Sequence, residues 1–178
     1  MASSMLFVRP DFWLASDCMR IRAAMDSGAA TPAEIAADDY RVDEEARRAF
    51  DVEVSDDVIS EVQHAIARIR PEIAEFFGLA LSDDEGPGLL RYSIGGFYRR
   101  HVDVSPEWDE RFPRRISVVV FLTSAGEQCE GGSLCVYLPE AREVAPRAGT
   151  LVAFPSEVPH EVLPVTSGVR DVVVDWFF

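Results

Sequence analysis

The second half of the chain is a series of short apolar runs separated by turn residues. Gly95-Gly96, Gly131-Gly132 and Ser167-Gly168 are among the turn signals. The runs that resemble strands lie at 89–94, 97–103, 115–123, 133–138, 142–145, 150–154, 161–165 and 169–177. About eight short strands at this spacing indicate an all-β sandwich or barrel, and we expect a double-stranded β-helix, the cupin-like jelly roll.

The first half has a different pattern, in which helical periodicity dominates. Apolar residues recur at helical spacing weakly over 11–27 and strongly over 56–77. Pro32 is placed where a short helical turn can begin, and 47–54 alternates like a strand. We therefore expect a mainly β protein with N-terminal helices.

The length of 178 residues fits one domain. We expect 1–178 to form a single domain, in which 1–88 is a helical support region and 89–178 is the jelly-roll core. The acidic loop at 82–88 marks the boundary between the two.

The charge balance limits the possible partners. With 17 basic and 31 acidic residues the net charge is −14, which disfavours a nucleic-acid partner. Arg99-Arg100 and 111–115 are local basic features that equally favour a small anionic substrate. The sequence shows no membrane-length apolar run and no secretory signal, and its three cysteines show no zinc-like pairing. We expect a cytoplasmic protein with reduced thiols and no membrane partner, and the oligomeric state stays open.

Three side chains form a candidate metal site. His101 and Asp103 are two residues apart in a predicted strand, so their side chains are expected to point to the same face. His160 follows a later apolar run. Two imidazoles and one carboxylate with open positions are the ligand set of non-haem Fe(II) oxygenases. We expect His101, Asp103 and His160 to bind the metal.

Arg170 lies ten residues after His160, at the start of the last apolar run. A guanidinium holds a carboxylate with two parallel hydrogen bonds, and a buried carboxylate requires such a partner. We expect Arg170 to hold the carboxylate of a substrate or co-substrate.

These residues belong to a wider pattern over about 89–178 that resembles the prolyl-4-hydroxylase-like branch of the Fe(II)/2-oxoglutarate-dependent oxygenases. The residues that carry the resemblance are Tyr92-x-x-Gly95-x-x-Tyr98-x-x-His101-x-Asp103, Arg115-x-Ser117-x-x-x-Phe121-Leu122, Gly131-Gly132-x-Leu134, Pro146-x-x-Gly149-x-Leu151-x-x-Phe154, His160-x-Val162-x-Pro164-Val165-x-x-Gly168-x-Arg170 and Trp176-Phe177. The resemblance implies a dioxygenase that uses Fe(II), 2-oxoglutarate and O2, with ascorbate as a candidate reductant. It implies hydroxylation of a C–H bond with release of succinate and CO2.

The resemblance also implies roles for individual residues. Arg170 and Tyr92 would bind 2-oxoglutarate, and Tyr98, Arg114 and Trp176 would contact the substrate. The implied substrate would be a prolyl residue of a peptide or a small amino-acid-like molecule.

The sequence departs from the family pattern at two places. Phe121 stands where some members have a tyrosine that hydrogen-bonds 2-oxoglutarate, so a hydroxyl of Tyr92, Ser117 or Thr123 must help. The segment 104–113 is shorter than the mobile loop of many peptide hydroxylases.

Two other functions use the same architecture. One is a non-redox cupin-like protein that binds a metal or a small molecule, because a fold alone does not determine function. The other is a nucleic-acid demethylase of the same chemistry, against which the net charge of −14 argues. Arg170 favours the oxygenase, since a plain cupin needs no carboxylate clamp there.

Overall fold

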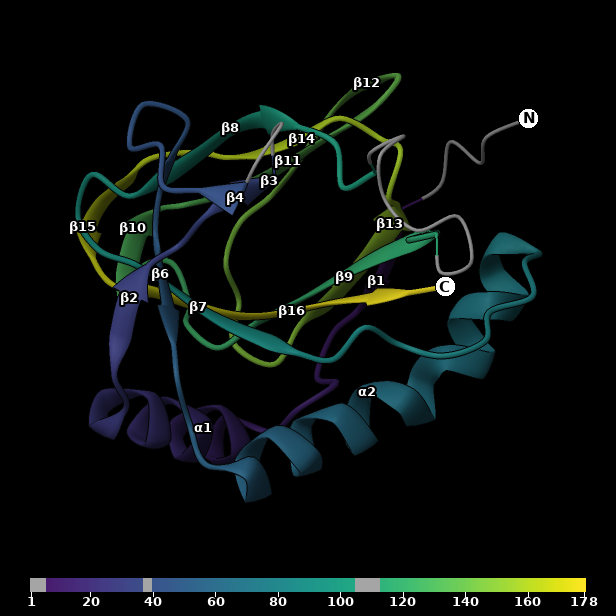
Figure 1. The fold of residues 1–178 in the computed structure, drawn as a ribbon, viewed down its shortest axis with the longest axis horizontal. Coiled ribbons are helices and arrows are strands. Elements are labelled where there is room, and N and C mark those ends of the chain that lie inside the picture. The colour runs from purple at the N-terminus through teal and green to yellow at the C-terminus, as the bar shows by residue number, and fades with distance from the viewer. Residues whose placement is uncertain (1–5, 37–39, 105–112) are drawn as a thin grey trace.

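The computed structural model describes residues 6–36, 40–104 and 113–178. Figure 1 shows two sheets that face each other, with both helices on the outer side of the larger one. The strand pairs that build these two sheets are antiparallel. The protein is therefore a sandwich of strands backed by helices.

The larger sheet has seven strands and mixes both halves of the chain. Their order across the sheet is β1 (Phe7–Arg9), β13 (Leu151–Pro155), β9 (Ile116–Phe121), β16 (Arg170–Phe177), β7 (Gly88–Tyr92), β6 (Phe50–Val52) and β2 (Ala30–Pro32). The N-terminal half thus supplies the strands at both edges.

The smaller sheet has five strands and carries most of the candidate metal site. Their order is β12 (Glu140–Val144), β11 (Leu134–Leu138), β14 (His160–Val162), β8 (Phe97–His101) and β5 (Arg47–Arg48). Two further pairs, each of two strands, are β10 (Cys129–Gly131) with β15 (Val165–Gly168) and β3 (Ile35–Ala36) with β4 (Tyr40–Arg41).

The two helices are α1 (Ala15–Ser27) and α2 (Asp56–Phe77). The predicted range of α2 is confirmed: Val62, Ile66, Ile69 and Ile73 are buried, and Gly78 ends the helix in the left-handed conformation at φ +65°. Helix α1 begins later than the predicted residue 11. The Asp17 carboxylate accepts a hydrogen bond from the Leu14 N–H, which fixes the first turn there.

The apolar residues form two buried clusters, one on each side of the larger sheet. One cluster joins α1 and α2 to the sheet, and the other fills the space between the two sheets. Strand β16 contributes to both sides because its side chains alternate: Val173 packs toward the helices, whereas Arg170, Val172 and Trp176 line the cavity between the sheets. This alternation places Arg170 inside the sandwich.

Some sequence expectations are wrong in detail. Pro32 does not begin a helical turn but ends β2, which lies at the edge of the sheet, where a proline interrupts no ladder. The region 1–88 supplies strands as well as helices, since β1, β2, β5 and β6 join the two main sheets, and β5 and β6 lie within the predicted strand over 47–54. Strand β10 lies outside the predicted runs, since its three residues carry too little apolar pattern.

Candidate active site

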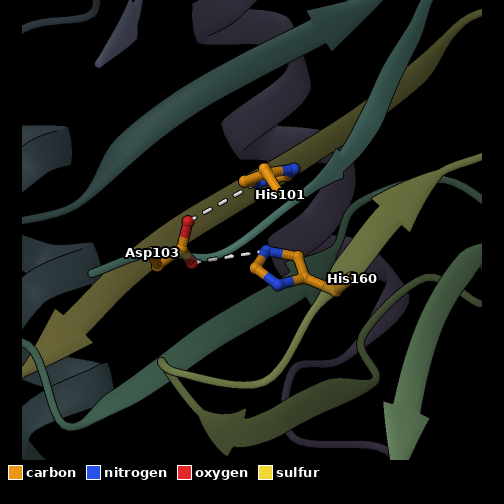
Figure 2. Close-up of side chains that lie close together, drawn as sticks. All are labelled: His101, Asp103 and His160. Atoms are coloured by element: carbon orange, nitrogen blue, oxygen red, sulfur yellow. Dashed lines mark ion pairs between the residues drawn. The ribbon is translucent and has the colours of Figure 1, made fainter. Parts of the chain in front are cut away.

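The candidate metal ligands come from two neighbouring strands. His101 is the last residue of β8, Asp103 lies two residues beyond it, and His160 is the first residue of β14. Strands β8 and β14 pair antiparallel with His160 opposite His101. The pairing brings together residues that are far apart in the sequence (Figure 2).

Figure 2 shows the Asp103 carboxylate beside both imidazoles, with one dashed line to each ring. Asp103 Oδ1 lies 3.5 Å from His101 Nε2, and Oδ2 lies 3.4 Å from His160 Nε2. One possible ligand atom from each residue lies within 4.8 Å of the others, and no other such group occurs in the described parts of the chain. The spacing leaves a common point that one cation can occupy.

Both imidazoles have their outer nitrogen engaged by the backbone. His101 Nδ1 lies 2.7 Å from the carbonyl oxygen of Arg99, and His160 Nδ1 lies 3.0 Å from that of Val158. A carbonyl only accepts hydrogen bonds, so each Nδ1 carries the proton. The lone pair of each Nε2 then faces Asp103, which is the arrangement of metal-binding histidines.

Asp103 is held by two donors that sequence reasoning did not assign to it. Ser117 Oγ and Trp176 Nε1 donate to the same oxygen, Oδ2, at 2.7 and 2.9 Å. Ser117 Oγ also lies 3.0 Å from Ser156 Oγ. These contacts fix the carboxylate plane, and only the pairing of β9, β13 and β16 brings the donors there.

The electrostatics of these groups favour a charged Asp103 carboxylate. Burial alone would raise the pKa of Asp103, but both histidines outweigh it and hold that pKa well below its usual range. Burial lowers the pKa of His101, against the opposing effect of Asp103. Burial also acts to lower the pKa of His160, yet the Asp103 carboxylate prevails and raises it. Asp103 therefore carries its negative charge next to the two imidazoles.

Arg170 lies at the closed end of the same cavity. It is 1 % exposed, and its Nε donates to the carbonyl oxygen of Gly132 at 2.7 Å. The guanidinium lies over the rings of Tyr92 and Phe121, with 4.7 and 5.3 Å to their centroids. Burial lowers the pKa of Arg170. Its Nη1 is buried and has no hydrogen-bond partner among the described residues, so a carboxylate would fit there.

The cavity of about 190 Å³ contains every predicted site residue. His101, Asp103, His160, Arg170, Tyr92, Tyr98, Arg114 and Trp176 all line it. Tyr98 stacks on His101 with 3.5 Å between ring centroids, and burial raises the pKa of Tyr98 to about 12. Arg114 lies 3.7 Å over the Trp176 ring and pairs with Glu85.

Three hydroxyl groups were candidates to replace the tyrosine that some family members have at the Phe121 position, namely those of Tyr92, Ser117 and Thr123. Ser117 binds Asp103, and Thr123 Oγ1 accepts a hydrogen bond from the Asp171 N–H. Tyr92 alone of the three lies against Arg170 in the cavity. Residues 105–112, which hold most of the predicted short loop and Arg111, lie outside the described residues.

Sequence reasoning missed one wall of the cavity. Glu34, Tyr40 and Arg47 line it from the N-terminal half, although the motif pattern covers only about 89–178. The sequence around these residues does not predict that they line a cavity, because a bulky or charged residue in an acidic stretch is usually exposed to solvent.

A sandwich of two sheets with two imidazoles, a carboxylate and a buried guanidinium around one cavity defines the non-haem iron oxygenase class. Residues 87–178 match the 2OG-Fe(II) oxygenase superfamily, and the chain belongs to this family. The family implies Fe(II), 2-oxoglutarate and O2, so the match agrees with the oxygenase prediction and not with a cupin-like binder without redox chemistry.

Individual proteins agree with this assignment. A PKHD-type hydroxylase of Rippkaea orientalis is 38 % identical over 88 residues, which are 48 % of this chain and 39 % of that protein. One of Colwellia psychrerythraea is 33 % identical over 120 residues, 65 % of this chain and 53 % of that protein. The chain thus spans well under two thirds of the length of these relatives.

The solved structures extend the likeness to nearly the whole chain. A Pseudomonas putida prolyl-4-hydroxylase is 27 % identical with a TM-score of 0.76, covering 97 % of this chain and 91 % of that one. A Trichoplax adhaerens prolyl hydroxylase crystallised with a peptide fragment has a TM-score of 0.80 at 19 % identity, covering 99 % of this chain and 84 % of that one. The predicted jelly-roll fold is confirmed. Among the described residues, no helix is long and apolar enough to cross a membrane.

Proposed function

We propose that the protein is an Fe(II)- and 2-oxoglutarate-dependent dioxygenase that hydroxylates a C–H bond and releases succinate and CO2. The observation that carries this proposal is the shared cavity: the ligand atoms of His101, Asp103 and His160 face the same space as the unpartnered nitrogen of buried Arg170. A metal and a carboxylate would complete these two groups.

His101, Asp103 and His160 would hold the iron. Two neutral Nε2 lone pairs and one carboxylate leave coordination positions open. When bound, the iron would supply the chemistry by which O2 oxidises 2-oxoglutarate to succinate and CO2, with one oxygen atom of O2 entering succinate and the other entering the C–H bond. Ser117 and Trp176 keep the carboxylate in one orientation through Oδ2.

Arg170 and Tyr92 would bind 2-oxoglutarate. The free Nη1 of Arg170 would donate to the distant carboxylate, and the Tyr92 hydroxyl is the nearest candidate for a second donor. Valines line the cavity beside them, and an apolar surrounding strengthens charge-assisted bonds.

The substrate would be a prolyl residue of a peptide or a small amino-acid-like molecule. Similarity to the Pseudomonas putida prolyl-4-hydroxylase and to the PKHD-type hydroxylases supports a hydroxylase with this kind of substrate. Tyr98, Arg114 and Trp176 would contact it, because they line the open side of the cavity near the metal ligands. Ascorbate would serve as an auxiliary reductant, and we place the protein in the cytoplasm.

Residues 1–178 would form one catalytic domain. The strands that 1–88 contributes to both sheets support this organisation, since the core of 89–178 shares its hydrogen-bond ladders with them. Both sheets would lose edge strands if the first half were removed.

The test is succinate release from 2-oxoglutarate in the presence of Fe(II). We expect His101→Ala or Asp103→Ala to abolish it, whereas substitution of the exposed His64 by Ala leaves it unchanged.

Arg170→Ala should raise the 2-oxoglutarate requirement by about tenfold or more, because a charge-assisted pair is lost. Mn(II) should raise the melting temperature of the wild type, since it binds only the folded site. Undiminished release in both ligand variants would reject the proposal.

A further inference from the structure

Strand β5 brings an arginine from the N-terminal half to the mouth of the cavity. Arg47 is paired with Tyr98 of β8 in the smaller sheet, and its side chain lines the cavity. The other residue of this short strand, Arg48, points away and lies over the Phe97 ring. Because side chains alternate along a strand, Arg47 points into the cavity and its neighbour Arg48 does not.

The Arg47 guanidinium is held in place from two sides. Its Cζ lies 4.7 Å from the centroid of Tyr98, the ring that stacks on His101. Its Nη1 donates to the carbonyl oxygen of Glu34 at 2.6 Å. Its Nε is buried and has no hydrogen-bond partner among the described residues. The Arg47 guanidinium therefore has a fixed position, with only the Tyr98 ring separating it from the candidate metal ligand His101. Not all of its N–H donors are used.

The charge of Arg47 also lacks a close partner. Eight other arginines have a carboxylate oxygen within 4.0 Å, namely Arg9, Arg20, Arg22, Arg41, Arg70, Arg91, Arg114 and Arg147. No described carboxylate lies this close to Arg47, although Asp51 is near enough for Arg47 to lower its pKa against the dominant effect of burial. In a chain of net charge −14, an unpaired cation at a cavity mouth needs an explanation.

The two other arginines of the cavity are already engaged. Arg114 pairs with Glu85, and Arg170 lies at the closed end, where the co-substrate would bind. Of the three arginines that line the cavity, Arg47 is therefore the best placed to bind an anionic group of the substrate.

We propose that Arg47 binds a carboxylate of the substrate, which is a free amino acid or the C-terminal residue of a peptide rather than an internal residue. This inference rests on the proposed function and specifies its substrate. A planar guanidinium with unused N–H donors forms charge-assisted bonds with such a carboxylate. The carboxylate would then lie one ring away from His101, because Tyr98 contacts both Arg47 and His101.

The experiment compares acid and amide forms of the same probes. L-proline and L-prolinamide form one pair, and a short peptide ending in proline with a free or amidated terminus forms the other. Binding is measured calorimetrically on protein loaded with Mn(II) and 2-oxoglutarate, and probe-stimulated succinate release is measured with Fe(II). We expect the wild type to prefer an acid form by about tenfold or more. The pair that shows this preference identifies the source of the carboxylate.

Substitutions at β5 separate recognition from folding. Arg47→Gln should remove the preference for the acid form, Arg47→Lys should keep part of it, and Arg48→Gln should keep all of it. Melting curves check that each variant folds. Equal binding of acid and amide by the wild type, a preference that survives Arg47→Gln, or no binding of any probe would overturn the proposal. Failure of the proposed function looks different, because the wild type would then release no succinate under any condition.

Discussion

The indole N–H of Trp176 donates a hydrogen bond to Oδ2 of Asp103 at 2.9 Å. Trp176 lies in β16 and Asp103 lies two residues beyond β8, and these two strands belong to different sheets. The bond therefore ties the candidate metal ligand of one sheet to the central strand of the other. Ser117 on β9 adds a second bond to the same oxygen.

Trp176→Phe should weaken metal binding. The substitution keeps an aromatic ring but removes the indole donor, so only the Ser117 hydroxyl still holds the Asp103 carboxylate. Loss of such a supporting hydrogen bond typically costs about tenfold to a hundredfold in metal affinity. Titration with Mn(II) measures the change, and Trp13→Phe, a substitution against the helix-side cluster, is the matched control. Equal Mn(II) affinity in Trp176→Phe and wild type would mean that Ser117 alone orients the carboxylate.

Asp175 should make the free energy of unfolding depend on pH. Its side chain is buried, Oδ2 has no partner among the described residues, and Oδ1 accepts hydrogen bonds from the N–H groups of Gly86 and Trp176. Burial raises the pKa of Asp175 to about 7, and Asp84 and Glu85 add to this. The folded state then holds this proton more tightly than the unfolded state, so stability falls as pH rises through the range up to about 7.

The variant Asp175→Asn removes this titration. Relative to the wild type, it should gain about 2 to 4 kcal/mol of unfolding free energy between pH 4 and pH 8. Urea unfolding at the two pH values measures the gain. A difference between the two proteins that does not change with pH would show that Asp175 is ionised in the folded state throughout.

The sequence predicted the parts of the fold and site that are encoded locally. The apolar repeat of 56–77 suffices for α2, and the i, i+2 spacing of His101 and Asp103 suffices to place both side chains on one side of the chain. His160 and Arg170 follow from the order of motifs along the chain, and the structure brings both to the same cavity.

The remaining parts depend on strand pairing over long separations. Arg47 meets Tyr98 only because β5 pairs with β8, and Ser117 meets Asp103 only because the two sheets face each other. Pro32 was expected to begin a helical turn because its fixed φ suits one, but the edge position in the sheet overrides that preference. None of these contacts has a signature within one segment.

Asp171 should be a major source of stability. It is fully buried next to Arg170, faces the helices, and pairs with Arg22 at 3.1 Å and with Arg91 at 2.8 Å. Asp171→Asn would leave two partly buried guanidiniums without their anion, at a cost of about 3 kcal/mol or more. Urea unfolding measures the loss. The control is Asp26→Asn, which removes the exposed partner of Arg91 and should cost under about 1 kcal/mol; similar losses in both variants would contradict the argument.

Gly132→Ala should weaken 2-oxoglutarate binding while leaving metal binding intact. A Cβ at Gly132 would lie 2.7 Å from Cδ of Arg170, whose Nε donates to the Gly132 carbonyl oxygen. The new methyl group would therefore displace the guanidinium from its position over Tyr92. Small displacements of a positioning group are costly, and we expect the concentration of 2-oxoglutarate for half-saturation to rise by about tenfold or more.

Gly126→Ala is the control that separates the contact with Arg170 from the effect of backbone strain. Gly126 and Gly132 both have positive φ, +81° and +69°, but nothing lies within 4 Å of a Cβ at Gly126. Both variants should lose about 1 to 2 kcal/mol of unfolding free energy from the left-handed conformation. Only Gly132→Ala should also lose 2-oxoglutarate affinity in a calorimetric titration, with Mn(II) affinity unchanged. If both variants bind 2-oxoglutarate like the wild type, the Gly132 backbone does not set the position of Arg170.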